Sequence, residues 1–162
     1  MTLKPRIFAN YDEGLLLCYE EEISGESYFG KLADFHTGRA KQALQLLSEM
    51  EAVTAKALLP LVERRGLRTA ERADLLAEGE IEAAKLRGMP WNNLISSWER
   101  DFPAFVVEMK QVADLAPAED EVGLLVLLDH EVAAIAFAER ETSAHPESLQ
   151  PLTEFLARHD SR

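Results

Sequence analysis

Glutamates that interrupt apolar helical stripes are the residues of this sequence whose types and spacing could do chemistry. Around Glu26, apolar or small residues recur at helical spacing, in the series Leu16, Tyr19, Ile23, Gly30 and Ala33. Burying an ionised carboxylate without a partner costs more free energy than a small domain can spare. Glu26 therefore lies at the edge of the stripe, or is protonated, or is paired, or binds a cation.

A second carboxylate, Glu51, interrupts another apolar stripe together with Thr54, between Leu47 and Leu58. Folding the two helical segments about a turn near Gly38 places Glu26 opposite residue 50. Glu51 then lies within about one residue, or roughly 1.5 Å of helical rise, of the same depth. Two interior carboxylates at one level repel each other unless a proton or a metal ion lies between them.

A third carboxylate, Glu131, is bracketed by an apolar series later in the chain, and His130 stands beside it on the flank of the stripe. The bracketing residues are Leu124, Leu127, Leu128, Ile135 and Ala138. We expect Glu131 to be a third interior carboxylate. His130 is either a hydrogen-bonded histidine of the helix flank or a ligand. Glu22, one turn before Glu26, is either solvated or a second oxygen donor.

The elements that must position these side chains are all helices. Apolar periodicity predicts helical segments at residues 11–36, 39–65, 69–87, 91–114, 119–142 and 147–158. Asn10 or Asp12 could cap the first segment. Gly14, Gly25 and Gly30 lower its helix propensity by about 1 kcal/mol each relative to alanine, which indicates a closely packed neighbour.

The connections indicate how the helices are arranged. Turn signals lie at residues 36–38, 88–90 and 116–118, and Gly66 is expected to end the second helix. Pro60 is expected to kink or thin the last turn of its helix, and Pro103 to bend its helix or split it near Asp101. No segment alternates with period two for long enough to predict a strand. The sequence therefore predicts a single all-α domain over residues 1–162, with two antiparallel hairpins, a long crossover that contains a helix, and a short C-terminal helix.

Composition excludes several classes of function. The net charge of −12 and the pI near 4.8 argue against binding to nucleic acid or to an anionic membrane surface. The single cysteine, Cys18, excludes an internal disulfide and a cysteine zinc cluster, and its apolar neighbours indicate a buried thiol. An apolar signal core and a run of about 18 apolar residues are both absent, so we expect a cytoplasmic location.

Three segments together resemble the ferritin-like superfamily, especially its rubrerythrin-like branch. They are EISGESYFGKLA (22–33), EMEAVTAKALLPL (49–61) and LLDHEVAAIAFAERE (127–141), and the resemblance covers residues 11–158. It implies a four-helix bundle that binds two iron or manganese ions through a Glu on the first helix and Glu-x-x-His on the second, repeated on the third and fourth. Glu26, Glu51 and Glu131 match the glutamates of the first, second and fourth helices.

The sequence departs from that pattern at both histidines. Thr54 and Ala134 stand where Glu-x-x-His would place them, and the third core helix offers no clean match, which favours one metal ion or none. Two functions remain open. One is a metal-binding protein with redox or oxygen chemistry at iron or manganese, through Glu26, Glu51, Glu131 and possible substitution by His130. The other is a metal-free bundle that acts as an interaction or structural module, expected to form a homodimer.

Overall fold

The computed structural model describes residues 2–159, and within that range every regular element is a helix. Asn10 begins the first helix, because its side chain accepts a hydrogen bond from the backbone N–H of Glu13. Gly66 ends the second, with a φ of +63° that suits glycine. The helices are α1 (Tyr11–Ala33), α2 (Gly38–Arg64), α3 (Arg72–Ala84), α4 (Trp91–Leu115), α5 (Glu121–Thr142) and α6 (Gln150–His159).

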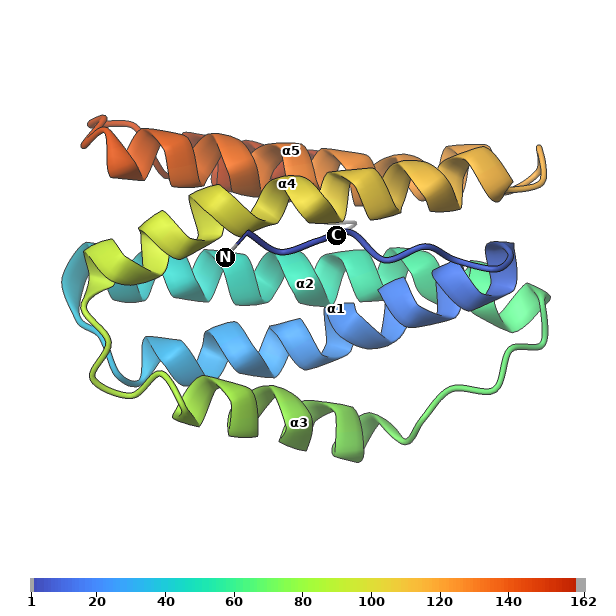
Figure 1. Cartoon of the computed structure of the whole chain (residues 1–162), viewed down its shortest axis with the longest axis horizontal. Helices are drawn as coiled ribbons and strands as arrows, with labels where there is room; N and C mark the ends of the chain where they lie inside the picture. The colour runs from blue at the N-terminus through green and yellow to red at the C-terminus, as the bar shows by residue number, and fades with distance from the viewer. Residues whose placement is uncertain (1, 160–162) are drawn as a thin grey trace.

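Four long helices run side by side as two antiparallel pairs (Figure 1). The α1–α2 pair is closed by the turn at residues 34–37, and the α4–α5 pair by residues 116–120. Between the pairs, the chain returns along the outside of α1 as α3, so that α2 and α4 run in the same direction (Figure 1). The predicted crossover with its own helix is therefore confirmed.

Glycines on two helices allow neighbouring segments to approach closely. A Cβ added at Gly79 of α3 would overlap the backbone of Ser24 on α1, and Ser27 donates a hydrogen bond to the Leu76 carbonyl at 2.7 Å. A Cβ at Gly14 would meet Val112 of α4 at 2.8 Å. The close packing that the α1 glycines predicted is thus confirmed at Gly14, and Gly25 is considered with the site below.

The N-terminal segment, residues 2–10, lies in extended form across α1 and α4 (Figure 1). Arg6 fixes it there by donating hydrogen bonds to Glu21 of α1 and to Glu108 of α4, with N–O distances of 2.6 to 3.1 Å. Glu108 is buried, with 1% of its surface exposed. Both of its oxygens accept hydrogen bonds from Arg6 of this segment.

The predicted helices all exist, with ends that differ by up to three residues from those expected. α1 stops at Ala33 rather than at residue 36, and α6 starts at Gln150 rather than at residue 147. Pro60 and Pro103 lie inside helices that continue through them. Cys18 is buried, as its neighbours indicated. Within the described residues, no helix has both the length and the apolarity that a membrane crossing requires.

Candidate metal centre

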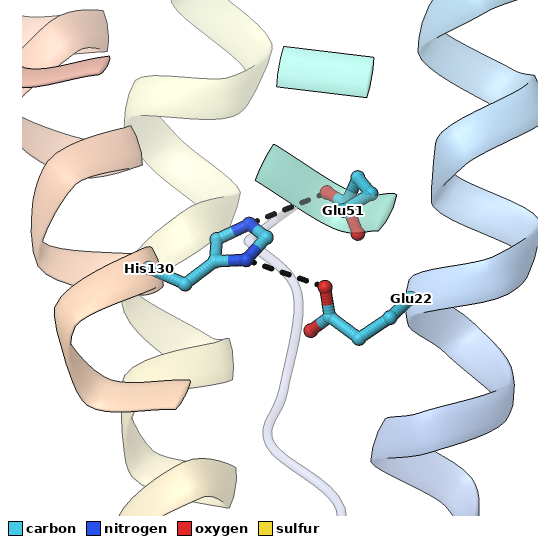
Figure 2. A group of neighbouring side chains, drawn as sticks. All are labelled: Glu22, Glu51 and His130. Carbon is cyan, nitrogen blue, oxygen red and sulfur yellow. Dashed lines mark ion pairs between the residues drawn. The ribbon is translucent and has the colours of Figure 1, made fainter. Parts of the chain in front are cut away.

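Three buried side chains from three helices meet between the two helix pairs. Nδ1 of His130 on α5 lies 3.2 Å from Oε2 of Glu22 on α1, and its Nε2 lies 3.3 Å from Oε1 of Glu51 on α2. Figure 2 shows the imidazole between the two carboxylates, with one ring nitrogen facing each. One ligand atom from each residue lies within 4.8 Å of the others. The arrangement is a compact Glu–Glu–His group.

Local sequence explains how each carboxylate reaches this point. Glu22 belongs to the buried face of α1 that also carries Leu15, Cys18, Phe29 and Leu32. Gly25 follows Glu22 by three residues, so it lies on the same face of the helix. A Cβ at Gly25 would lie 2.6 Å from Cδ of Glu51. The absence of a side chain at residue 25 therefore provides the space in which Glu51 enters the group.

Thr54 orients the imidazole of the group. Its hydroxyl donates to the Met50 carbonyl oxygen at 2.8 Å and lies 2.9 Å from Nδ1 of His130. A threonine hydroxyl has one hydrogen, so once that hydrogen is used on Met50 the oxygen can only accept from Nδ1–H. In the neutral tautomer, Nε2 then carries the free lone pair. A histidine oriented in this way has Nε2, the nitrogen that faces Glu51, free to bind a metal ion while its second nitrogen is hydrogen-bonded.

Burial and mutual repulsion perturb the titration of the group. Burial, followed by the charge of Glu22, raises the pKa of Glu51 to about 8, against the opposing effect of His130. Burial acts to lower the pKa of His130, but the nearby charges of Glu22 and Glu51 outweigh it and raise that pKa well above its usual value. Burial and the charges within the group therefore favour the protonated forms of both Glu51 and His130.

One oxygen of the group has no hydrogen-bond partner. Oε2 of Glu22 is buried, and within residues 2–159 no donor satisfies it in hydrogen-bonding geometry. Leaving a buried charged acceptor unsatisfied is expensive. Two carboxylates and one imidazole form a donor set that suits iron, manganese or zinc. The residues present therefore fit a single divalent metal ion, with Glu22, Glu51 and His130 as its protein ligands.

Glu131 lies beside the group but is not part of it. It is 8% exposed, and among the described residues it has no ion pair or side-chain hydrogen bond. Burial raises the pKa of Glu131 to about 7, despite the opposing effect of His130. Together with the Glu–Glu–His group it lines a cavity of about 380 Å³. Glu131, one residue after His130, is therefore a third interior carboxylate, as expected.

The structure places Glu26 outside the group, although we expected it beside Glu51. Its carboxylate forms an ion pair with Arg72 of α3 at 2.5 Å, and its side chain is 29% exposed. Of the four residues expected to bind metal, the structure thus brings Glu51 and His130 into the group and Glu131 next to it. Glu22 occupies the position expected of Glu26, one helical turn earlier.

The signal that identifies Glu22 is present in the sequence. The series Leu15, Cys18, Glu22, Phe29 and Leu32 has the same helical spacing as the series that led to Glu26. Both series are largely buried, because α1 is covered by the other long helices on one side and by α3 on another. Periodicity alone does not distinguish the face that meets α3, where Arg72 reaches Glu26, from the face that meets α2 and α5.

The fold and the site together define a class: an all-helical protein with two antiparallel helix pairs and a buried Glu–Glu–His group between them. Comparisons of this chain with protein-family models, with curated proteins and with solved structures gave no match.

Proposed function

We propose that this protein binds one divalent metal ion, iron or manganese, through Glu22, Glu51 and His130. The proposal rests on the buried Oε2 of Glu22, which has no hydrogen-bond donor among the described residues, faces an imidazole and lies near a second carboxylate. A cation at this point would satisfy that oxygen and would neutralise the repulsion between Glu22 and Glu51. Burial of an ionised carboxylate pair is otherwise unfavourable.

The resemblance to the ferritin-like superfamily supports this choice of metal, and a ferritin-like bundle is the fold that we propose for the four long helices. The order of two helix pairs with a crossover containing α3 is consistent with it. When bound, iron or manganese would supply Lewis acidity and one-electron redox chemistry. The residues of this chain would hold the ion and, through Thr54, fix the orientation of the imidazole.

Two glutamates one turn apart on α1 provide a matched test. The protein, purified without chelator, is analysed for metal and then titrated with Mn²⁺ and Fe²⁺ under anaerobic conditions. We expect close to one equivalent of metal, a loss of binding in Glu22→Gln and in Glu51→Gln, and unchanged binding in Glu26→Gln, whose carboxylate pairs with Arg72. Metal-free protein with no affinity for either ion, or equal effects of the Glu22 and Glu26 substitutions, would contradict the proposal.

A second candidate function, a metal-free interaction module, is favoured by the position of His130. A protonated imidazole between the two carboxylates would pair with both of them, at 3.2 and 3.3 Å, without a metal ion. The partner we propose in this case is a second copy of the chain, held at the exposed apolar residues of α5, namely Val122, Leu125 and Val132. A protein whose stability ignores added metal, and whose dimer is lost on Leu125→Glu in light-scattering measurements, would support this function instead.

A further inference from the structure

The lining of the cavity beside the Glu–Glu–His group combines two kinds of side chain. Carboxylates come from α1, α2, α4 and α5, and aromatic side chains come from α1 and α4. Trp98 and Phe102 are stacked, with ring planes inclined by 10° and centroids 5.8 Å apart. The volume of about 380 Å³ lies in the range of about 300–1,000 Å³ that is usual for small-molecule sites.

The charged residues of the lining are all acidic, apart from His130. Within the described residues, neither lysine nor arginine lines this cavity. Two of its carboxylates already have cationic partners outside the lining, since Glu21 pairs with Arg6 and Asp101 pairs with Arg100. The two carboxylates of the Glu–Glu–His group face the imidazole. Glu131 is the remaining carboxylate of the lining, more than nine-tenths buried and without a side-chain partner among the described residues.

We propose that this cavity binds a small organic ammonium ion with an apolar body, its ammonium group on Glu131 and its body against Trp98 and Phe102. The inference rests on the proposed function for its chemical role, because the ligand would lie next to the metal ion as a substrate. Occupation of the cavity itself does not require the metal.

Charge and shape both favour this class of ligand. An anionic ligand would enter a lining with several carboxylates and no guanidinium or ammonium group. An ammonium ion would instead provide an ion-pair partner for the Glu131 carboxylate, which has no such partner among residues 2–159. Indole and phenyl faces attract cations and also bury apolar surface, so the aromatic residues of the lining suit the remainder of such a molecule. A long aliphatic or aromatic chain attached to a primary amine combines these features.

Three probes of similar size and different charge test the proposal: 4-phenylbutylamine, 4-phenylbutan-1-ol and 4-phenylbutyrate. Binding to the full chain is measured by calorimetry and by the fluorescence of the two tryptophans, with and without Mn²⁺. We expect the amine to bind at least tenfold more tightly than the alcohol, and the carboxylate to bind most weakly in the metal-free protein. Glu131→Gln should remove the preference for the amine, and Glu139→Gln, an exposed position two turns along the same helix, should keep it.

The outcomes separate this inference from the proposed metal site. Amine binding that persists in Glu22→Gln, which lacks a metal ligand, supports an ammonium site on Glu131 even if no metal binds. Equal binding of the three probes, no binding of any probe to wild-type protein that retains its far-ultraviolet circular dichroism, or release of bound Mn²⁺ by the amine would overturn it. Release of Mn²⁺ would mean that the ammonium group occupies the position of the metal rather than the cavity beside it.

Discussion

Oγ1 of Thr54 lies 2.9 Å from Nδ1 of His130 and donates its own hydrogen to the carbonyl oxygen of Met50. The threonine stands three residues after Glu51, where the ferritin-like pattern would place a histidine ligand. In this chain, α2 therefore provides an acceptor that orients an imidazole, and the imidazole itself comes from α5. If the group binds a metal ion as we propose, its nitrogen ligand therefore comes from α5 and not from α2.

Replacing Thr54 with valine tests this relationship, because the shape is nearly conserved and the hydroxyl is lost. We expect Thr54→Val to weaken Mn²⁺ binding by roughly 10- to 100-fold, the usual effect of removing the partner that orients a ligating histidine. Thr54→Ser retains the acceptor and should bind within a few-fold of wild type. Calorimetric titration with Mn²⁺ measures both, and a valine variant that binds as tightly as the serine variant would show that the hydroxyl has no such role.

Gly25 and Gly30 on α1 provide a pair of alanine substitutions with opposite expected results. A Cβ at Gly25 would overlap the carboxylate of Glu51, so Gly25→Ala should displace a metal ligand and reduce Mn²⁺ affinity. A Cβ at Gly30 would meet only Oγ of Ser48, at 3.4 Å, so Gly30→Ala should raise the free energy of unfolding by up to about 1 kcal/mol without changing metal affinity. Chemical denaturation and Mn²⁺ titration of both variants provide the measurements.

Helix number, order and connectivity could be predicted from this sequence because each long helix has its own apolar period and the turns carry glycine or proline. Helix ends were less accurate, since they depend on local contacts. The split expected as one alternative at Pro103 does not occur, because α4 continues through it, and α2 likewise continues through Pro60; both prolines lie at exposed positions. Both prolines therefore disturb only the solvent side of helices that are held by burial on the other side.

The site could be predicted in part. Glu51, Glu131 and His130 were identified because each interrupts or flanks the apolar stripe of its helix. Glu22 was not preferred over Glu26 because α1 is covered on two sides, and a helix with two buried faces does not reveal which carboxylate meets the centre. Arg6 and Glu108 lie 102 positions apart in the sequence, so helical periodicity could not predict the hydrogen bond between them.

The stability of the metal-free protein should fall as the pH rises from about 5 to about 8. Burial raises the pKa of Glu51 from 4.5 to about 8 and that of Glu131 from 4.5 to about 7. Between 4.5 and those values the folded protein retains protons that the unfolded chain has released, so the free energy of unfolding decreases with pH. The raised pKa of His130 acts in the same direction above 6.5. Calorimetric melting across this range measures the effect.

Two controls accompany the pH series. Glu51→Gln cannot release a proton at that position, so its melting temperature should depend less on pH than that of wild type. Saturating Mn²⁺ should reverse the trend, because the metal binds deprotonated ligands and stabilises the fold more as the pH rises. A melting temperature of the chelated protein that increases steadily from pH 5 to pH 8 would contradict the protonated state of the buried group.

Arg6 should contribute to stability through the buried carboxylate that it satisfies. Its guanidinium donates to both oxygens of Glu108, which is 1% exposed. Arg6→Met keeps an apolar side chain and removes these donors, so we expect a loss of about 1–3 kcal/mol in the free energy of unfolding, the usual cost of an unsatisfied buried acceptor. Urea denaturation measures the loss. Because an amide is less costly to leave partly satisfied than a carboxylate, adding Glu108→Gln to Arg6→Met should recover part of it, whereas additive losses in the double variant would show that the two side chains act independently.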